Sequence, residues 1–157
     1  KAEEQYLKKR FNFVMIILTS LIVLTALTIG LNTKLRLEII WVAILAGILG
    51  SSISALISAL QRKANGWEFS SGIKYPRETP EDKFSIRMSM FFIFRPLLGI
   101  MSGLIIYYGY TIILNIEPIY NDPNTGNLIF WSLLAGLFAK SLIEKLQQIF
   151  KNLIGMK

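Results

Sequence analysis

Four stretches of this chain are apolar for long enough to cross a lipid bilayer as helices. The hydrocarbon core of a bilayer is about 30 Å thick, and a helix needs roughly 20 apolar residues to cross it. The stretches cover residues 11–31, 39–60, 88–114 and 128–146, and 53% of all residues are hydrophobic. The sequence therefore predicts an all-α integral membrane protein, a single domain of four transmembrane helices arranged as two hairpins.

The basic residues lie beside these stretches and predict their orientation. Four Lys or Arg residues precede the first span, six lie in the connection 61–87 and four lie in the C-terminal part, against two in the opposite turns. Lys and Arg are enriched in the cytoplasmic flanks of membrane helices. We therefore expect a multi-pass protein of the inner (plasma) membrane with both termini cytoplasmic. Nucleic acid is not expected as a partner, because the charges follow the membrane flanks rather than one polar face.

The chain contains no cysteine and no histidine. Disulfides, thiolate metal sites and catalytic triads that use His are therefore excluded. The sequence also lacks a phosphate-binding glycine loop and any metal-ligand spacing. We expect no cofactor, no metal and no enzymatic activity.

The second and third predicted spans carry rows of small residues at helical spacing. These residues are Gly47, Gly50, Ser51, Ser54, Ala55, Ser58, Gly99 and Gly103. Small residues four apart allow two helix backbones to approach closely, and serine hydroxyls can form hydrogen bonds across the contact. The rows predict a packing surface, either against another span of the same chain or against a second copy. A pore lining is the third alternative.

Three charged residues lie inside or close to the predicted spans, namely Arg95, Lys140 and Glu144. Arg95 is about 10 Å inside the cytoplasmic boundary of the third span, and the other two lie about 18 and 24 Å along the fourth, at a similar level. Charges inside a membrane are costly unless they are paired or hydrated. An Arg95–Glu144 ion pair is one interpretation, and an Arg95 that extends to the membrane surface is another. The cluster serves either a structural role or the binding of an ion or a substrate.

The C-terminal segment, about 139–156, predicts an amphipathic helix. Its apolar face includes Leu142, Leu146, Ile149 and Leu153. Their alternating spacings of four and three are those of the a and d positions of a heptad. A short bundle of such helices from several subunits fits this pattern, and so does a single helix lying at the membrane interface.

The connection 61–87 is the one candidate for structure outside the membrane. Its segment Thr79-Pro80-Glu81-Asp82 combines an N-cap residue, a proline for the first helical position and an acidic first turn. The third helix is therefore expected to begin there. Trp67 is expected to pack the connection against the membrane surface or against a cytoplasmic protein partner.

Three short segments occur together in this chain: Phe94-Arg95-Pro96-Leu97-Leu98-Gly99, Leu134-Ala135-Gly136-Leu137-Phe138, and Gly50-Ser51 near the end of the second span. In this combination the chain resembles small uncharacterised four-span bacterial membrane proteins. Some of these accompany phage-defence or stress systems as membrane effectors. The resemblance implies assembly into an oligomer that perturbs the membrane.

The leading functional hypothesis is a non-enzymatic homo-oligomeric membrane protein, either a channel-like pore or a membrane-anchoring effector subunit in bacterial defence or stress response. The small-residue rows would form the subunit contact, and Arg95, Lys140 and Glu144 would line the cytoplasmic mouth. Its partners would be the lipid bilayer, further copies of the chain, and a cytoplasmic protein bound through 61–87 and the C-terminal helix. The alternative is a small solute or ion transporter that uses Glu144 or Arg95.

Overall fold

The computed structural model describes residues 2–35, 37–68, 83–113, 115, 123–141 and 145. Within these residues the regular structure consists of five α-helices, one π-helical segment and a single isolated β-bridge. The elements follow in the order α1 (Ala2–Gly30), α2 (Asn32–Leu35), α3 (Ile39–Ala64), α4 (Ile86–Tyr108), η2 (Gly109–Ile113) and α5 (Pro123–Leu137). The predicted all-α fold class is confirmed for this part of the chain.

Three helices are long and apolar enough to cross a membrane: α1, α3 and the helix Met88–Ile113 that α4 forms with η2. The shorter two have 26 residues. At 1.5 Å per residue they extend about 39 Å, which exceeds a hydrocarbon core of about 30 Å. Large apolar side chains such as Ile16, Leu24 and Ile112 are exposed on these helices, as side chains that face lipid would be. The first three predicted spans are therefore confirmed as helices suited to a multi-pass membrane protein.

The fourth predicted span corresponds to α5, which begins five residues before the expected Leu128. Pro123 fits the first helical position because that position needs no backbone N–H donor. The 15 residues of α5 extend about 22 Å, less than the hydrocarbon core. Residues 139–141 are helical again after a turn at Phe138, whereas 142–144 and 146 lie outside the described residues.

The prediction that the third long helix begins at Thr79 is wrong, because Lys83 and Phe84 are not helical. The helix begins instead at Ile86, where Ser85 adopts an extended conformation and its hydroxyl accepts a hydrogen bond from the Met88 amide. Serine is a favoured residue at this capping position. Residues 79–82 themselves lie outside the described part.

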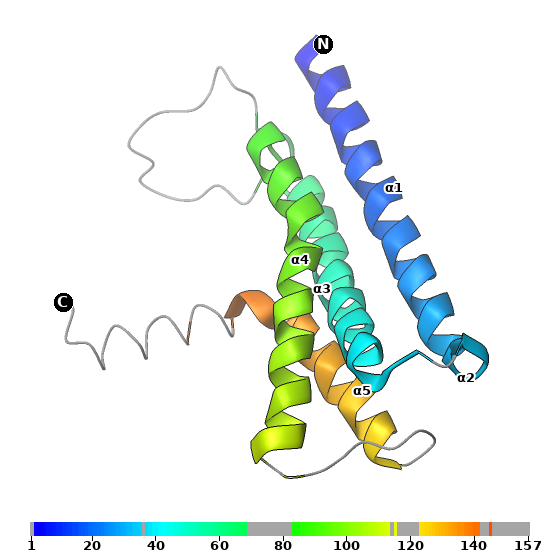
Figure 1. Ribbon diagram of the computed structural model, residues 1–157. Coiled ribbons are helices and arrows are strands. Elements are labelled where there is room, and N and C mark those ends of the chain that lie inside the picture. Colours follow the sequence, from blue (N-terminus) through cyan, green and yellow to red (C-terminus); the bar gives the residue numbers. More distant parts are fainter. Residues whose placement is uncertain are drawn as a thin grey trace, which may run out of the picture.

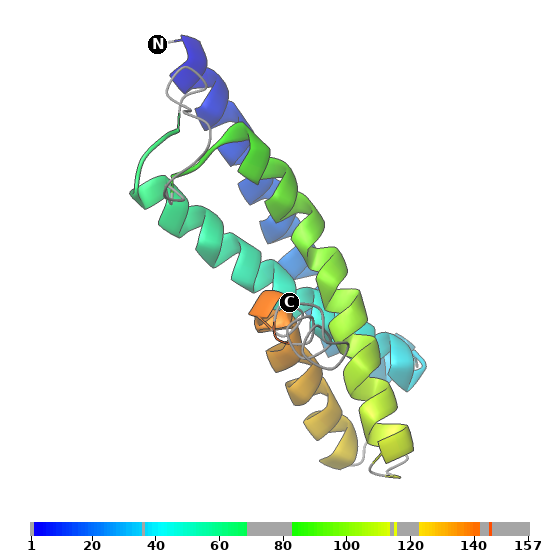
Figure 2. The same cartoon turned by 90° about the vertical axis from the view of Figure 1, so that its left-hand side faces the viewer.

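The helix α3 occupies the centre of the bundle and contacts α1, α4 and α5. Figures 1 and 2 show α3 crossing between α1 and α4, with α5 packed on its first half. The start of α1, the end of α3 and the start of α4 lie at one end, called here the N-terminal end of the bundle (Figure 1). The described helices thus pack into one bundle around α3.

The closest packing in the bundle occurs where glycines of α3 meet α4 and α5. A Cβ atom added at Gly47 would collide with the Gly99 carbonyl oxygen of α4, and one added at Gly136 of α5 would collide with the Gly47 carbonyl oxygen. On the next turn, a Cβ at Gly50 would collide with the Leu133 carbonyl oxygen of α5. The backbone of α3 is therefore in direct contact with the backbones of two neighbouring helices of the same chain.

An aromatic cluster joins α1 to the two ends of the connection between α3 and α4. Trp67 and Phe84 form the β-bridge, in which the Glu68 amide donates to the Phe84 carbonyl and the Phe84 amide donates to the Gly66 carbonyl, both at 3.0 Å. The rings of Trp67 and Phe84 pack edge-on against each other and against Phe11 of α1. Trp67 therefore packs within the chain.

We predict that Gly47→Ala lowers the free energy of unfolding by about 1–3 kcal/mol, because the new methyl group meets backbone atoms that cannot rotate away. The control is Gly126→Ala, also in a helix, where an added Cβ meets nothing within 4 Å. This control should be neutral or slightly stabilising, since alanine favours helices over glycine. Unfolding in mild detergent measures both, and equal stability of the two variants would contradict the packing described here.

Candidate functional site

The guanidinium group of Arg95 reaches from α4 to the face of α3. Arg95 Nη1 donates to Ser58 Oγ and Nη2 donates to Ser54 Oγ, both at 2.9 Å. The two serines are one helical turn apart, so their hydroxyls match the two prongs of the planar guanidinium. The ring centroid of Phe91, one turn earlier on α4, lies 5.9 Å from Arg95 Cζ. Arg95 is thus oriented by two neutral oxygen atoms and an aromatic ring.

A hydrogen bond next to Arg95 sets the register between α3 and α4. The buried Ser51 hydroxyl shares its proton between the Ile48 carbonyl oxygen of its own helix, at 3.0 Å, and the Pro96 carbonyl oxygen of α4, at 3.2 Å. One turn further along α4, Gly99 packs against Ser51 and Gly47. Because Ser51, Ser54 and Ser58 share one face of α3, the same register that brings Ser51 to Pro96 brings the other two hydroxyls to Arg95.

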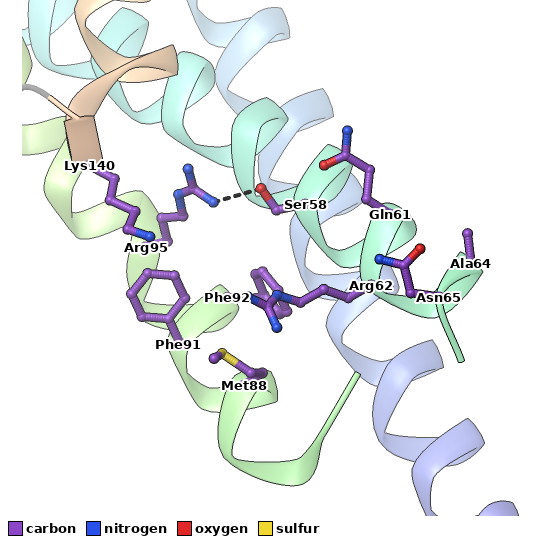
Figure 3. Close-up of a pocket in the computed structure, with 10 residues that line it drawn as sticks. All are labelled: Ser58, Gln61, Arg62, Ala64, Asn65, Met88, Phe91, Phe92, Arg95 and Lys140. Carbon is purple, nitrogen blue, oxygen red and sulfur yellow. Dashed lines mark hydrogen bonds between the residues drawn. The ribbon is translucent and has the colours of Figure 1, made fainter. Parts of the chain in front are cut away.

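A pocket of about 640 Å³ lies beside Arg95 at the N-terminal end of the bundle. Its lining residues are Ser58, Gln61, Arg62, Ala64, Asn65, Met88, Phe91, Phe92, Arg95 and Lys140. Figure 3 shows that the end of α3 and the start of α4 supply the walls and that Lys140 enters from the chain beyond α5. We call this cavity the Arg95 pocket.

The turn at the end of α5 brings Lys140 to the pocket. The helix α5 ends at Leu137, Phe138 forms a turn, and residues 139–141 are helical. Ala139 is buried and fixes this short segment against the bundle, whereas Lys140 is exposed at the pocket.

The Arg95 pocket is basic on one side and apolar on the other. Its charged lining residues are Arg62, Arg95 and Lys140, and the lining contains no Asp or Glu among the residues that the structure describes. Arg62 Nη1 also donates to the Lys83 carbonyl oxygen at 3.4 Å, whereas the described hydrogen bonds of Arg95 go to neutral serine hydroxyls. The arginine fork in addition matches the oxygen geometry of a phosphate or a carboxylate. The chemistry that this arrangement offers is anion binding.

The structure brings together some of the charged residues singled out in the sequence. Arg95 and Lys140 line the same pocket. Glu144 lies outside the described residues, so the expected Arg95–Glu144 pair stays a prediction, and the partners that Arg95 has in the described part are Ser54 and Ser58. The heptad residues also lie outside the described part, namely Leu142, Leu146, Ile149 and Leu153.

The glycines singled out in the sequence lie between α3, α4 and α5, whereas Ala55 belongs to the core cluster that α3 forms with α1 and Phe92 of α4. Ser51 and Ala55 are fully buried, and Gly47, Gly99 and Gly103 meet at the crossing of α3 and α4. Their contacts are made within one chain. A subunit contact through these residues, which the leading hypothesis used, would have to displace α4 or α5.

Sequence reasoning missed Arg62 as a pocket residue. The row Gly50, Ser54 and Ser58 continues at the same spacing to Arg62, one turn further along α3. Residues four apart share a helix face. The row therefore carried a signal for Arg62, but a basic residue at the end of a span is also what a membrane flank contains. The aromatic and methionine side chains of the pocket carry no such signal.

We predict that the double substitution Ser54→Ala with Ser58→Ala lowers the free energy of unfolding by about 1.5–3 kcal/mol, because a half-buried guanidinium loses two acceptors. The matched control is Ser52→Ala on the same helix. Ser52 is buried too, but its hydroxyl donates to the Ile48 carbonyl of its own helix. The control should change stability by less than about 1 kcal/mol. Detergent unfolding measures both, and equal losses would argue that the bonds to Arg95 contribute nothing.

No protein family is identified for this chain. Comparisons of the chain with protein-family models, with curated proteins and with solved structures found no match. The resemblance to small four-span bacterial membrane proteins therefore stays an expectation from short sequence segments. The functional interpretation rests on the basic and apolar walls of the Arg95 pocket.

Proposed function

We propose that this protein is a non-enzymatic, multi-pass inner-membrane protein that binds an anionic group in the Arg95 pocket, at the cytoplasmic side. The observation that supports this proposal most directly is the guanidinium of Arg95, whose described hydrogen-bond partners are two neutral serines and which lines a pocket together with Arg62 and Lys140. Ionisable side chains that lie inside an apolar helix are costly, and they commonly mark functional sites.

The proposed topology has four spans, with both termini in the cytoplasm. The helix α5 extends about 22 Å, so residues after the turn at Phe138 would have to complete the crossing of the fourth span. The excess of Lys and Arg in the flanks supports the orientation. In this topology the N-terminal end of the bundle, and with it the Arg95 pocket, faces the cytoplasm.

A homo-oligomeric pore or effector subunit is less well supported than binding by a single chain. The predicted subunit contact, which contains Gly47, Gly50 and Gly99, is used for packing within the chain. An assembly would therefore need another surface, such as the exposed apolar side of α1 or the segment beyond residue 145. A role in bacterial defence or stress response is proposed from the resemblance alone.

The second candidate is a carrier for a small anionic solute. The position of Arg95 favours it, since Phe94 and Leu97 next to it are 59% and 55% exposed and would face lipid in a membrane. Arg95 would then bind its ligand below the membrane surface, as a carrier site does. Uptake of the bound anion into proteoliposomes distinguishes this candidate, because a pure binding protein produces no flux.

The first prediction from this proposal concerns topology. The chain has no cysteine, so single cysteines can be placed at Lys9, Gly126 and Lys145. In intact cells a membrane-impermeant maleimide should label Gly126→Cys, and it should label Lys9→Cys and Lys145→Cys only after permeabilisation. Labelling of Lys145→Cys from outside would mean that α5 does not complete a fourth span. A reversed pattern for all three would contradict the orientation.

The second prediction concerns binding. Arg95→Gln and Lys140→Gln should each weaken the binding of anions by about tenfold or more, because each removes a charged hydrogen bond of roughly 1.5–3 kcal/mol. Calorimetric titration of the protein in uncharged detergent measures this with pyrophosphate, inorganic phosphate and phosphatidylglycerol as probes. If Arg95→Gln does not fold, Lys140→Gln still tests the binding, because Lys140 is exposed and its substitution should leave the helix packing intact.

The matched control for the binding experiment is Lys9→Gln. It removes one positive charge at the same end of the bundle, from an exposed residue outside the pocket. This variant should bind all probes as the unmodified protein does. Absence of binding for every probe would contradict the proposed function, and so would equal binding by the Arg95, Lys140 and Lys9 variants.

A further inference from the structure

The Arg95 pocket places a basic wall directly against an apolar wall, and this combination indicates what kind of anion it takes. We propose that the pocket binds the phosphate group of an anionic phospholipid, with the start of an acyl chain lying against Phe91 and Met88. The inference rests on the proposed anion-binding function and names its ligand class.

The polar wall has the donors that a phosphodiester requires. Arg95 uses two of its five N–H groups in the bonds to Ser54 and Ser58, so three are left outside those two bonds. Arg62, which also donates to the Lys83 carbonyl oxygen at 3.4 Å, and Lys140 line the same space and add positive charge to it. A phosphate that sits between these cations accepts charge-assisted hydrogen bonds, which are stronger than neutral ones.

The apolar wall distinguishes a lipid from a free anion. Met88, Phe91 and Phe92 line the pocket, and Phe91 is 40% exposed at its edge. Inorganic phosphate gains nothing from such a wall, whereas an acyl chain is attracted to it in proportion to the area buried.

The place of the pocket along the helices fits the same ligand. It lies at the ends of α3 and α4, beside Ser58 to Asn65 and Met88 to Arg95. Basic pockets between membrane helices, near the headgroup level of a leaflet, are suited to lipid phosphates. Its volume of about 640 Å³ falls in the range of roughly 300–1,000 Å³ found for pockets that hold small organic ligands.

The test compares three probes on the purified full chain in uncharged detergent, with binding followed by native mass spectrometry and calorimetry. The probes are phosphatidylglycerol, phosphatidylcholine with the same acyl chains, and inorganic phosphate. Phosphatidylglycerol should bind at least about tenfold more tightly than either of the others. Binding of inorganic phosphate as tight as that of phosphatidylglycerol would overturn the lipid assignment and leave the proposed function standing, whereas failure of all three probes would overturn both.

A pair of phenylalanine variants tests the apolar wall. Phe91→Ala should weaken the binding of phosphatidylglycerol by about fivefold or more, because it removes ring surface from the pocket. It should weaken the binding of inorganic phosphate less. Phe94→Ala is the control, because Phe94 is an exposed phenylalanine on the same helix and is not among the lining residues. Equal phosphatidylglycerol binding by the two variants, or binding that Lys140→Gln leaves unchanged, would overturn the inference.

Discussion

The backbone contact of α3 with both α4 and α5 is the constraint on which the rest of the structure depends. Gly47 contacts Gly99 on one side, and its carbonyl oxygen faces Gly136 on the other. Helices that touch through glycines cannot slide or rotate without a clash, because backbone atoms have no alternative rotamers. In a membrane, where lipid tails are as apolar as leucine, such close packing replaces the hydrophobic effect as the force that joins helices.

The position of the charged site follows from that contact. With Gly47 at the crossing, Ser51 comes opposite the Pro96 carbonyl, and Ser54 and Ser58 come opposite the Arg95 guanidinium. The four α3 positions lie on one helix face at spacings of three and four, so a single register aligns them all. The helix packing that stabilises the fold therefore also orients the arginine.

The sequence alone was sufficient for features that depend on composition along one helix. Three long helices appear where hydrocarbon thickness requires apolar length, and the small-residue rows lie at close contacts. Features that depend on distant residues were missed. The sequence did not indicate the bonds of Arg95 to Ser54 and Ser58, because rotation about the helix axis decides which groups meet. The expected pair of Arg95 with Glu144 stays a prediction, because Glu144 lies outside the described residues. The start of α4 was likewise misplaced, because the bridge between Trp67 and Phe84 depends on residues far apart in the chain.

The chemical nature of the partners of Arg95 separates an anion site from a structural ion pair. A carboxylate at position 54 or 58 would neutralise the guanidinium inside the chain, and a bidentate ion pair is the strong form of such a contact. Serine hydroxyls hold the same fork in the same orientation but bring no negative charge. The positive charge of Arg95 is thus oriented but not compensated by its two serine partners, and Arg62 and Lys140 line the same pocket. Charge in an apolar setting is costly without a counter-charge, and the neutral character of these two partners of Arg95 is what supports an anionic ligand in the proposed function.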